Sequence, residues 1–254
     1  DVVSLFDALL KSQSPESALL HLNYFSAPAL GRFATHGEAS VLAQQNYIRA
    51  LEFLHSTRFM KTLGRHVVDR GGTTFPAFVP GEDYDRMQRV RVWKLEEKHT
   101  DVNLALAMYM DAASGCYQQL VVCSNDSDIE PVMRAIRDHF PAITLGLVAP
   151  MHPLKTGASA GRKLSASLER QADWVRAHLL DEELERAQLP EKIHTGTTEV
   201  TACTAGAEHE HAHQLRSPTP FFSSHRPSDA SATTNPIISA YATHSGTSLV
   251  PSRP

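Results

Sequence analysis

The sequence predicts an α/β fold in which helices flank a central parallel β-sheet. Residues 89–95 alternate polar and apolar side chains, which is the period of a strand, and residues 119–123 form a short apolar run typical of a strand covered on both faces. Each run is followed by apolar residues at helical spacing, over residues 102–112 and 131–136. Strands that alternate with helices are joined by crossovers, so the pattern favours parallel pairing.

The same two periodicities assign the other elements. Amphipathic helices are predicted over residues 1–12 and 37–55, and further strands over residues 19–25 and 142–148. Residues 164–187 are predicted to form a closing helical region, because their apolar side chains recur at helical spacing.

The composition changes at residue 191, where hydrophobic periodicity gives way to Thr, Ser, Ala, Pro and His. We therefore expect one domain over residues 1–190 and a disordered tail over residues 191–254. The His-rich run 208–213 in that tail is not expected to be a specific metal site, because such a site needs rigid surroundings.

Charge and cysteine content narrow the class of protein. The 254 residues carry a net charge of -4, which excludes a globally basic nucleic-acid binder, although a nuclease needs only a local basic path. The three cysteines, Cys116, Cys123 and Cys203, lack metal-ligand spacing, so we expect a reducing, cytoplasmic location. No run is long and apolar enough for a transmembrane helix, and no membrane partner is expected.

Two acidic clusters follow the strand-like runs. Asp101 comes after the first run and a short link, and Asp126 and Asp128 come directly after the second. Ligands of parallel sheets bind outside the carboxyl ends of the strands, so we expect the three carboxylates to converge at that edge. Carboxylate oxygens are preferred ligands of hard divalent cations such as Mg²⁺ or Mn²⁺.

Helix capping offers a simpler explanation of the same acids. Ser127 with Glu130 fits a capping box, Asn125 is another candidate cap, and an aspartate in a first helical turn complements the helix dipole. Capping accounts for any one of these acids. It accounts less well for two successive strand ends that both carry them, so both interpretations stay open at this point.

Two motifs resemble the paired signature of the NYN domain family, a group of PIN-like, LabA-type proteins regarded as metal-dependent ribonucleases. They are Glu-Glu-Lys-His-Thr-Asp-Val-Asn-Leu-Ala at 96–105 and Ser-Asn-Asp-Ser-Asp-Ile at 124–129. The resemblance covers roughly residues 1–190 and implies a PIN-like three-layer fold with a central parallel sheet flanked by helices. His99 stands where the family usually has Gly, and Ile129 stands where it has Leu or Phe.

The resemblance also implies that a segment is missing. NYN domains open with a strand that carries an acid, in a context such as D-G-x-N-L, whereas this chain starts with the helical pattern of residues 1–12. Asp1 and Asp7 lie within that pattern and do not replace the acid. We therefore expect an N-terminally incomplete chain that lacks a central strand and one metal ligand, and that is poorly stable because backbone groups are left unpaired.

For function, the resemblance implies a nuclease, a hydrolase that cleaves RNA phosphodiester bonds with a Mg²⁺ or Mn²⁺ ion. The expected catalytic and metal-binding residues are Asp101, Asp126 and Asp128. The expected substrate-binding residues are Asn103, Lys98, Ser124 and Asn125. The expected partner is single-stranded RNA, for which basic residues between Arg58 and Lys98 offer a path along the phosphates.

Other functions stay open beside the nuclease. A non-catalytic RNA- or protein-binding module on the same fold is favoured by the absent first acid and the acidic net charge. A phosphotransfer enzyme with a D-x-D loop fits less well, because it needs a nucleophilic acid at a first strand end. The sequence is also compatible with a homo-oligomer.

Overall fold

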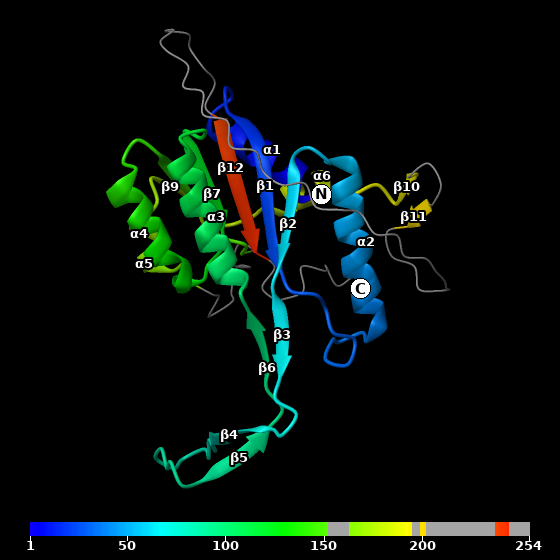
Figure 1. The fold of residues 1–254 in the computed structure, drawn as a ribbon, viewed down its shortest axis with the longest axis vertical. Coiled ribbons are helices and arrows are strands. Elements are labelled where there is room, and N and C mark those ends of the chain that lie inside the picture. Colours follow the sequence, from blue (N-terminus) through cyan, green and yellow to red (C-terminus); the bar gives the residue numbers. More distant parts are fainter. Residues whose placement is uncertain (152–162, 195–198, 202–236, 244–254) are drawn as a thin grey trace.

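A computed structural model describes residues 1–151, 163–194, 199–201 and 237–243. Its centre is a six-stranded sheet with the order β2-β1-β12-β7-β8-β9, in which all neighbouring strands are parallel (Figure 1). The strands are β1 (Ala18–Ser26), β2 (Phe59–Leu63), β7 (Gln119–Cys123), β8 (Thr144–Val148), β9 (Trp174–Arg176) and β12 (Ile237–Thr243). The predicted α/β fold with a central parallel sheet is confirmed.

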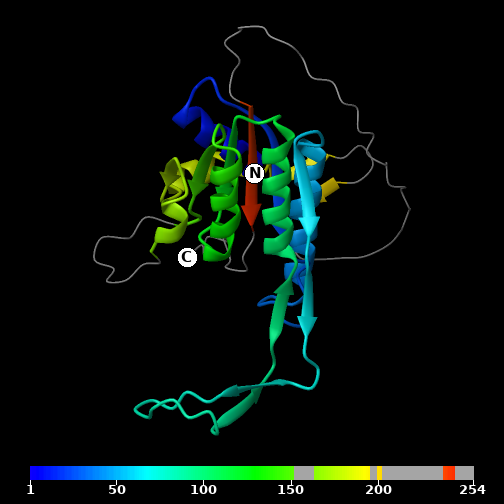
Figure 2. The same cartoon turned by 60° about the vertical axis from the view of Figure 1, so that its left-hand side comes forward.

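Helices cover both faces of this sheet (Figures 1 and 2). One face carries α1 (Val2–Gln13), α2 (Glu38–Leu54) and the short α6 (Asp181–Arg186). The other carries α3 (Thr100–Ser114), the 3-10 turn η1 (Ser127–Ile129), α4 (Glu130–His139) and α5 (Ala166–Glu169). Each face has its own apolar core, with Phe6 and Leu51 in the first and Met108 and Ile136 in the second.

Helix α1 shows how local sequence produces these layers. Asp1 caps the helix, because its Oδ1 accepts hydrogen bonds from the backbone N–H groups of Val3 at 3.1 Å and Ser4 at 3.2 Å. Val3, Phe6 and Leu10 then recur at helical spacing and are almost completely buried. The predicted helix at residues 1–12 therefore packs its apolar stripe on the sheet as expected.

Strand β12 lies in the middle of the sheet, between β1 and β7. The prediction of a disordered tail is wrong for this segment, and also for β10 (Lys192–His194) and β11 (Glu199–Thr201), which pair antiparallel. Residues 239–242 alternate between the two cores, since Ala240 and Ala242 join one and Tyr241 joins the other. The division into a domain over residues 1–190 and a tail over residues 191–254 otherwise stays a prediction.

The same strand corrects the expectation of a vacant central position. β12 pairs in parallel with β1 on one side and with β7 on the other. The backbone groups of those two strands therefore find partners, and the predicted instability from an unfilled strand position loses its physical basis.

Residues 89–95 do not form a strand of the central sheet. They contribute β5 (Arg89–Val92) to a long antiparallel arm that also contains β3 (Arg65–Val68), β4 (Thr73–Pro76) and β6 (Leu95–Lys98). The alternation of polar and apolar side chains correctly indicates a strand. However, this two-residue period occurs both in a solvent-exposed ribbon and in a strand of a central sheet, so it does not distinguish between them. Figure 1 shows the arm leaving the body at the carboxyl edge of the sheet.

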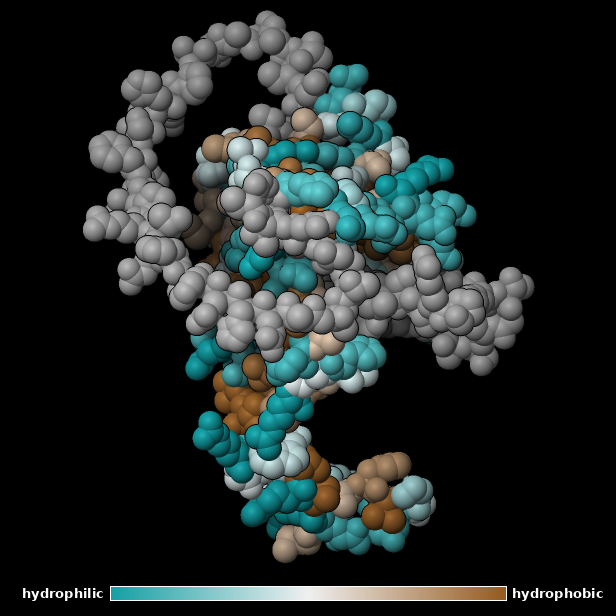
Figure 3. Space-filling view, turned by 90° about the vertical axis from the view of Figure 1, so that its right-hand side faces the viewer, coloured by the Kyte–Doolittle hydropathy of each residue, from teal (hydrophilic) through white to brown (hydrophobic). Residues whose placement is uncertain are grey.

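The arm exposes several large hydrophobic side chains, and hydrophobic areas, in brown, are visible along it in Figure 3. The exposed side chains include Val67, Phe75, Phe78, Tyr84, Met87, Val90, Val92, Trp93 and Leu95. A two-stranded ribbon has little core of its own, so its base depends on contacts with the body. Two such contacts are the Arg32 guanidinium 5.3 Å from the Trp93 ring centroid and the His66 Nδ1 2.9 Å from the carbonyl oxygen of Pro28.

The closing helical region predicted at residues 164–187 is only partly helical. It contains α5, β9 and α6, and β9 adds the last strand to the sheet beside β8. Trp174 explains the difference, because its indole ring lies directly over Gly146 of β8, where a Cβ atom would lie only 2.2 Å from the ring. The close approach that this glycine permits draws the segment into the sheet.

Within the described residues, no helix is both long and apolar enough to cross a membrane. Cys123 is buried at the end of β7, as expected, and burial raises the pKa of its thiol to about 12. Cys116 is exposed, and Cys203 lies outside the described residues.

Candidate acidic site at the carboxyl edge of the sheet

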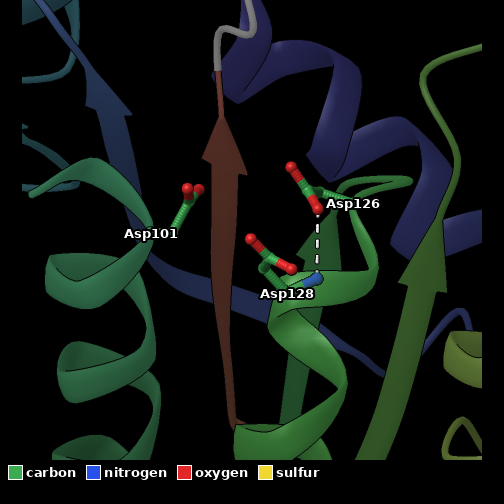
Figure 4. Close-up of side chains that lie close together, drawn as sticks. All are labelled: Asp101, Asp126 and Asp128. Atoms are coloured by element: carbon green, nitrogen blue, oxygen red, sulfur yellow. Dashed lines mark hydrogen bonds between the residues drawn. The ribbon is translucent and has the colours of Figure 1, made fainter. Parts of the chain in front are cut away.

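Three carboxylates meet at the carboxyl edge, as predicted. Oxygen atoms of Asp101, Asp126 and Asp128 all lie within 4.8 Å of one another, and the three side chains are exposed. Asp101 belongs to the first turn of α3, whereas the other two belong to the segment that follows β7. In Figure 4, the end of β12 is seen between Asp101 and the Asp126–Asp128 pair.

Asp101 is brought to this edge by a route that the sequence did not indicate. The chain leaves the body along β3, returns along β6 and enters α3 directly, so Asp101 follows an arm strand and not a strand of the sheet. The hydroxyl group of Thr100 donates a hydrogen bond to the carboxylate of Glu97, which holds a fourth acid beside the helix start.

The pKa of Asp101 is raised above its ordinary value. Partial burial is the largest cause, followed by the negative charges of Asp126, Glu97 and Asp128. The N-terminus of α3 favours a negative charge at this position, so burial and like-charge repulsion outweigh the helix dipole here. The surroundings therefore favour the protonated form of Asp101.

Asp126 acts as a cap. Its Oδ1 accepts a hydrogen bond from the backbone N–H of Asp128 at 3.0 Å, drawn as the dashed line in Figure 4. Its own backbone N–H donates to Ser124 Oγ at 3.1 Å. The capping box expected from Ser127 and Glu130 gives way to this arrangement, because Glu130 instead pairs with Arg134 at 3.1 Å.

Asn125 and Ser124 have structural roles in the same loop. Asn125 Nδ2 donates to the carbonyl oxygen of Lys163 at 3.0 Å, and its Oδ1 accepts from the N–H of Ser165 at 2.8 Å. Ser124 is buried and receives the Asp126 N–H described above. These two predicted substrate-binding residues therefore position the acids by joining the loop after β7 to residues 163–165.

The substrate-binding roles expected of Lys98 and Asn103 stay predictions. Lys98 Nζ lies 2.7 Å from Glu96, which Lys94 also contacts, and these hydrogen bonds, first from Lys94 and then from Lys98, lower the pKa of Glu96 to about 2. Asn103 lies two residues after Asp101 on α3, and residues at that spacing point to different sides of a helix.

His99 adopts a backbone conformation that L side chains disfavour. Its φ of 78° places it in the left-handed region just before α3, which is why glycine suits this position. We expect His99→Gly to raise the free energy of unfolding by about 1 kcal/mol, since the left-handed strain exceeds the entropy that glycine adds to the unfolded chain.

Urea unfolding of the two proteins measures this difference. His99→Ala is the matched control, because alanine keeps the Cβ atom that causes the strain and should give no gain. An unchanged unfolding midpoint in the glycine variant would contradict the assigned strain.

A second polar group, which the sequence analysis missed, lies deeper in the molecule. Asp111 on α3 accepts hydrogen bonds from Ser239 Oγ at 3.0 Å and from the hydroxyl group of Tyr241. The residues are separated by about half of the chain, so no local periodicity could have brought them together. The only available signal was the short apolar–small alternation around Tyr241 within an otherwise irregular tail.

Comparison with known proteins finds one informative relative. The chain is 33% identical over 176 residues to 6-hydroxy-3-succinoylpyridine 3-monooxygenase HspA of Pseudomonas putida (strain DSM 28022 / S16). The match covers 68% of this chain and 53% of the relative, so the chain spans about half of that protein's length. No family model matches the chain, and no solved structure matches it.

This relative contradicts the resemblance to NYN nucleases, because its name assigns a monooxygenase reaction and not hydrolysis of RNA. The expectations of a ribonuclease and of a Mg²⁺ or Mn²⁺ cofactor are corrected with it. The structure supplies a physical reason for the false signal. Ser124 and Asp126 of the second motif accept hydrogen bonds from backbone N–H groups of their own loop, and Asn125 binds backbone groups of residues 163–165, so all three side chains have structural roles.

Proposed function

We propose that this chain takes part in the oxygen-dependent oxidation of a small hydroxylated aromatic acid, the class of reaction for which its bacterial relative is named. The identity of 33% over 176 residues carries this proposal. The relative's name describes a pyridine ring with a hydroxyl group at position 6, a succinoyl group at position 3 and oxygenation at position 3.

The acidic edge suits one step of such a reaction, which is removal of a proton from the substrate. A ring hydroxyl group increases electron density at the ortho and para carbons more strongly once it is deprotonated. Position 3 of a pyridine lies para to position 6, so a base beside the 6-hydroxyl group activates the carbon that is oxygenated. General bases work best when their pKa approaches the pH of the reaction.

We assign this base to Asp101. Its raised pKa brings the carboxylate closer to the range in which a base exchanges protons readily, and Asp126 and Asp128 contribute to that shift through their charges. The same charges repel the carboxylate of a succinoyl side chain. The substrate is therefore oriented with its ring hydroxyl group toward Asp101 and its anionic side chain away from the acidic edge.

A monooxygenase also needs a two-electron donor, and such donors commonly carry phosphate groups. The acidic edge does not fit a phosphate, because three carboxylates oppose its charge. The sequence also lacks the glycine-rich turn that cradles a pyrophosphate. The electron donor is therefore not assigned to this edge.

The proposal predicts that the full chain binds 6-hydroxy-3-succinoylpyridine and consumes oxygen in its presence with a reduced nicotinamide as electron donor. Asp101→Asn should lower kcat/KM roughly 10²- to 10⁴-fold, the usual contribution of a general base. Asp138→Asn is the matched control, because Asp138 lies near the opposite end of α4. Calorimetric titration and an oxygen electrode measure the two properties, and a chain that shows neither binding nor oxygen uptake overturns the proposal.

The pH dependence of the same reaction tests the assigned charges. Asp101 accepts a proton only when it is ionised, so kcat/KM should rise with pH as Asp101 passes through its raised pKa. Asp126→Asn removes one like charge and should move this rise to lower pH, while burial of Asp101 keeps part of the shift. A rise that stays in place or moves to higher pH would exclude Asp101 as the base.

The expected partners, single-stranded RNA and a second copy of the chain, stay predictions, as does the cytoplasmic location. The RNA-binding alternative gains no support from the relative.

A further inference from the structure

β12 is separated from the preceding described strand by residues 202–236, and yet it is one of the two central strands of the sheet. Its register runs without irregularity along β7, from Ile238 opposite Gln119 to Ala242 opposite Cys123. On the other side it pairs with β1 from Ala18 to Phe25, with one irregularity near His21. The facing edges of β1 and β7 therefore form a strand-shaped site with hydrogen-bonding groups on both sides.

The side chains of β12 are recognised differently on its two faces. Toward one core it presents the small residues Ala240 and Ala242, both buried against Val121 and Cys123. Toward the other it presents Tyr241, which is 0% exposed and lies over the Phe25 ring at a centroid distance of 6.4 Å. A register slip of one residue would place tyrosine in the space of an alanine.

A polar network fixes the same register. Tyr241 and Ser239 both donate hydrogen bonds to the carboxylate of Asp111, and Asn23 Nδ2 donates to Ser239 Oγ at 3.2 Å. The network therefore joins β12 to α3 and to β1. Hydrogen bonds to a charged acceptor are among the stronger ones in proteins. This network requires a hydroxyl group at two defined positions, 239 and 241.

We propose that the space between β1 and β7 is a binding site for an extended peptide strand, that it selects the pattern Ser-Ala-Tyr-Ala of residues 239–242, and that the chain's own segment 237–243 is its occupant. In this mode, backbone hydrogen bonds supply affinity and alternate side chains supply specificity. Residues 202–236 tether the occupant and give it a high effective concentration at its own site, which favours binding within one chain over exchange with a second copy. This inference does not depend on the proposed oxidation.

Cleavage of the tether tests whether the strand is a separable ligand. A site for a sequence-specific protease is introduced between residues 202 and 236 of the full chain, and the folded protein is cleaved and passed over a size-exclusion column. The C-terminal piece should elute with the body. An excess of a synthetic peptide of residues 235–245 should then displace it. A C-terminal piece that separates at once from a body that stays folded overturns the proposal.

Altered peptides test the specificity. The Tyr241→Phe peptide lacks one hydroxyl group that reaches Asp111, and it should compete roughly 10- to 100-fold more weakly. A peptide of the same composition in which Tyr241 and Ala242 are exchanged is the control, because it places tyrosine on the opposite face of the strand, and it should not compete. Equal competition by all three peptides would show that the site does not recognise this pattern.

Hydrogen–deuterium exchange of the intact chain provides an independent measurement. Amides of residues 238–242 should exchange as slowly as those of β7, and exchange as fast as in a free peptide would overturn the proposal by itself. A third outcome is slow exchange together with a dimer whose subunits mix when differently labelled chains are combined. That outcome would show that residues 237–243 bind a second copy, and it would reject binding within one chain.

Discussion

Replacing Tyr241 with alanine is expected to lower the free energy of unfolding by about 3–5 kcal/mol, the usual range for removing a buried aromatic side chain. Tyr241 is 0% exposed, packs on Phe25 and donates to Asp111. Its removal leaves a large cavity in the centre of the sheet and takes a hydrogen-bond donor from a carboxylate. Burial and the nearby charge of Asp111 both raise the pKa of Tyr241, so the hydroxyl group stays a donor throughout the neutral range.

Urea unfolding followed by circular dichroism measures this loss. Tyr84→Ala is the matched control, because Tyr84 lies on the arm with 78% of its surface exposed and its removal should change stability by less than about 0.5 kcal/mol. The comparison also decides between two descriptions of the C-terminal segment. If residues 237–243 were a disordered tail, the two variants would unfold alike.

Gly64→Ala is expected to lower the free energy of unfolding by about 1–3 kcal/mol, which is typical of overpacking at a tight contact. Gly64 lies between β2 and β3, where the arm leaves the body. A Cβ atom there would lie 2.5 Å from the carbonyl oxygen of Lys98 and 2.4 Å from Thr100 Oγ1. The backbone oxygen cannot rotate away, so the start of α3 must move.

This movement should also displace Asp101, which follows Thr100 directly, so the variant should lose substrate binding as well as stability. Gly71→Ala is the control, because its added Cβ atom would meet only Asp69 Oδ1 at an ordinary 3.4 Å. Thermal unfolding and substrate titration of both variants check the two effects. Wild-type behaviour of Gly64→Ala in both measurements would show that the arm base can shift without affecting α3.

Charged groups at the acidic edge influence stability as well as chemistry. An acid whose pKa is raised on folding favours the folded state most when it is protonated, and that contribution is lost as the pH rises through the raised pKa. The ionised form of Asp101 therefore opposes folding, because it is partly buried and because Asp126, Glu97 and Asp128 repel it. Retention of such an unfavourable group is itself consistent with a role in binding or proton transfer.

The sequence by itself determined those elements whose signals are local. α1 and α2 follow from the helical spacing of their apolar residues, and β7 follows from a short, continuous apolar run. The convergence of Asp101 with Asp126 and Asp128 followed from one further rule, that the carboxyl ends of parallel strands share an edge. Their geometry is observed, whereas their role in oxidation remains a proposal.

Function was less accessible to short motifs. Ser124 and Asp126 accept hydrogen bonds from backbone N–H groups of their own loop. The same short sequence can therefore stabilise a turn or bind a metal ion. Sequence identity spread over 176 residues contains more information than two motifs, and it indicates a monooxygenase relative.

Three features are determined only by tertiary contacts: the position of the arm, the strand β9 at the edge of the sheet and the strand β12 at its centre. β5 and β6 have the period of sheet strands but pair only within the arm, and β9 joins the sheet because Gly146 leaves room for Trp174. β12 depends on contacts with β1, β7 and Asp111, all of which are distant in the sequence. Such contacts decide where a short segment binds because a strand of seven residues has too little local preference to select its own place.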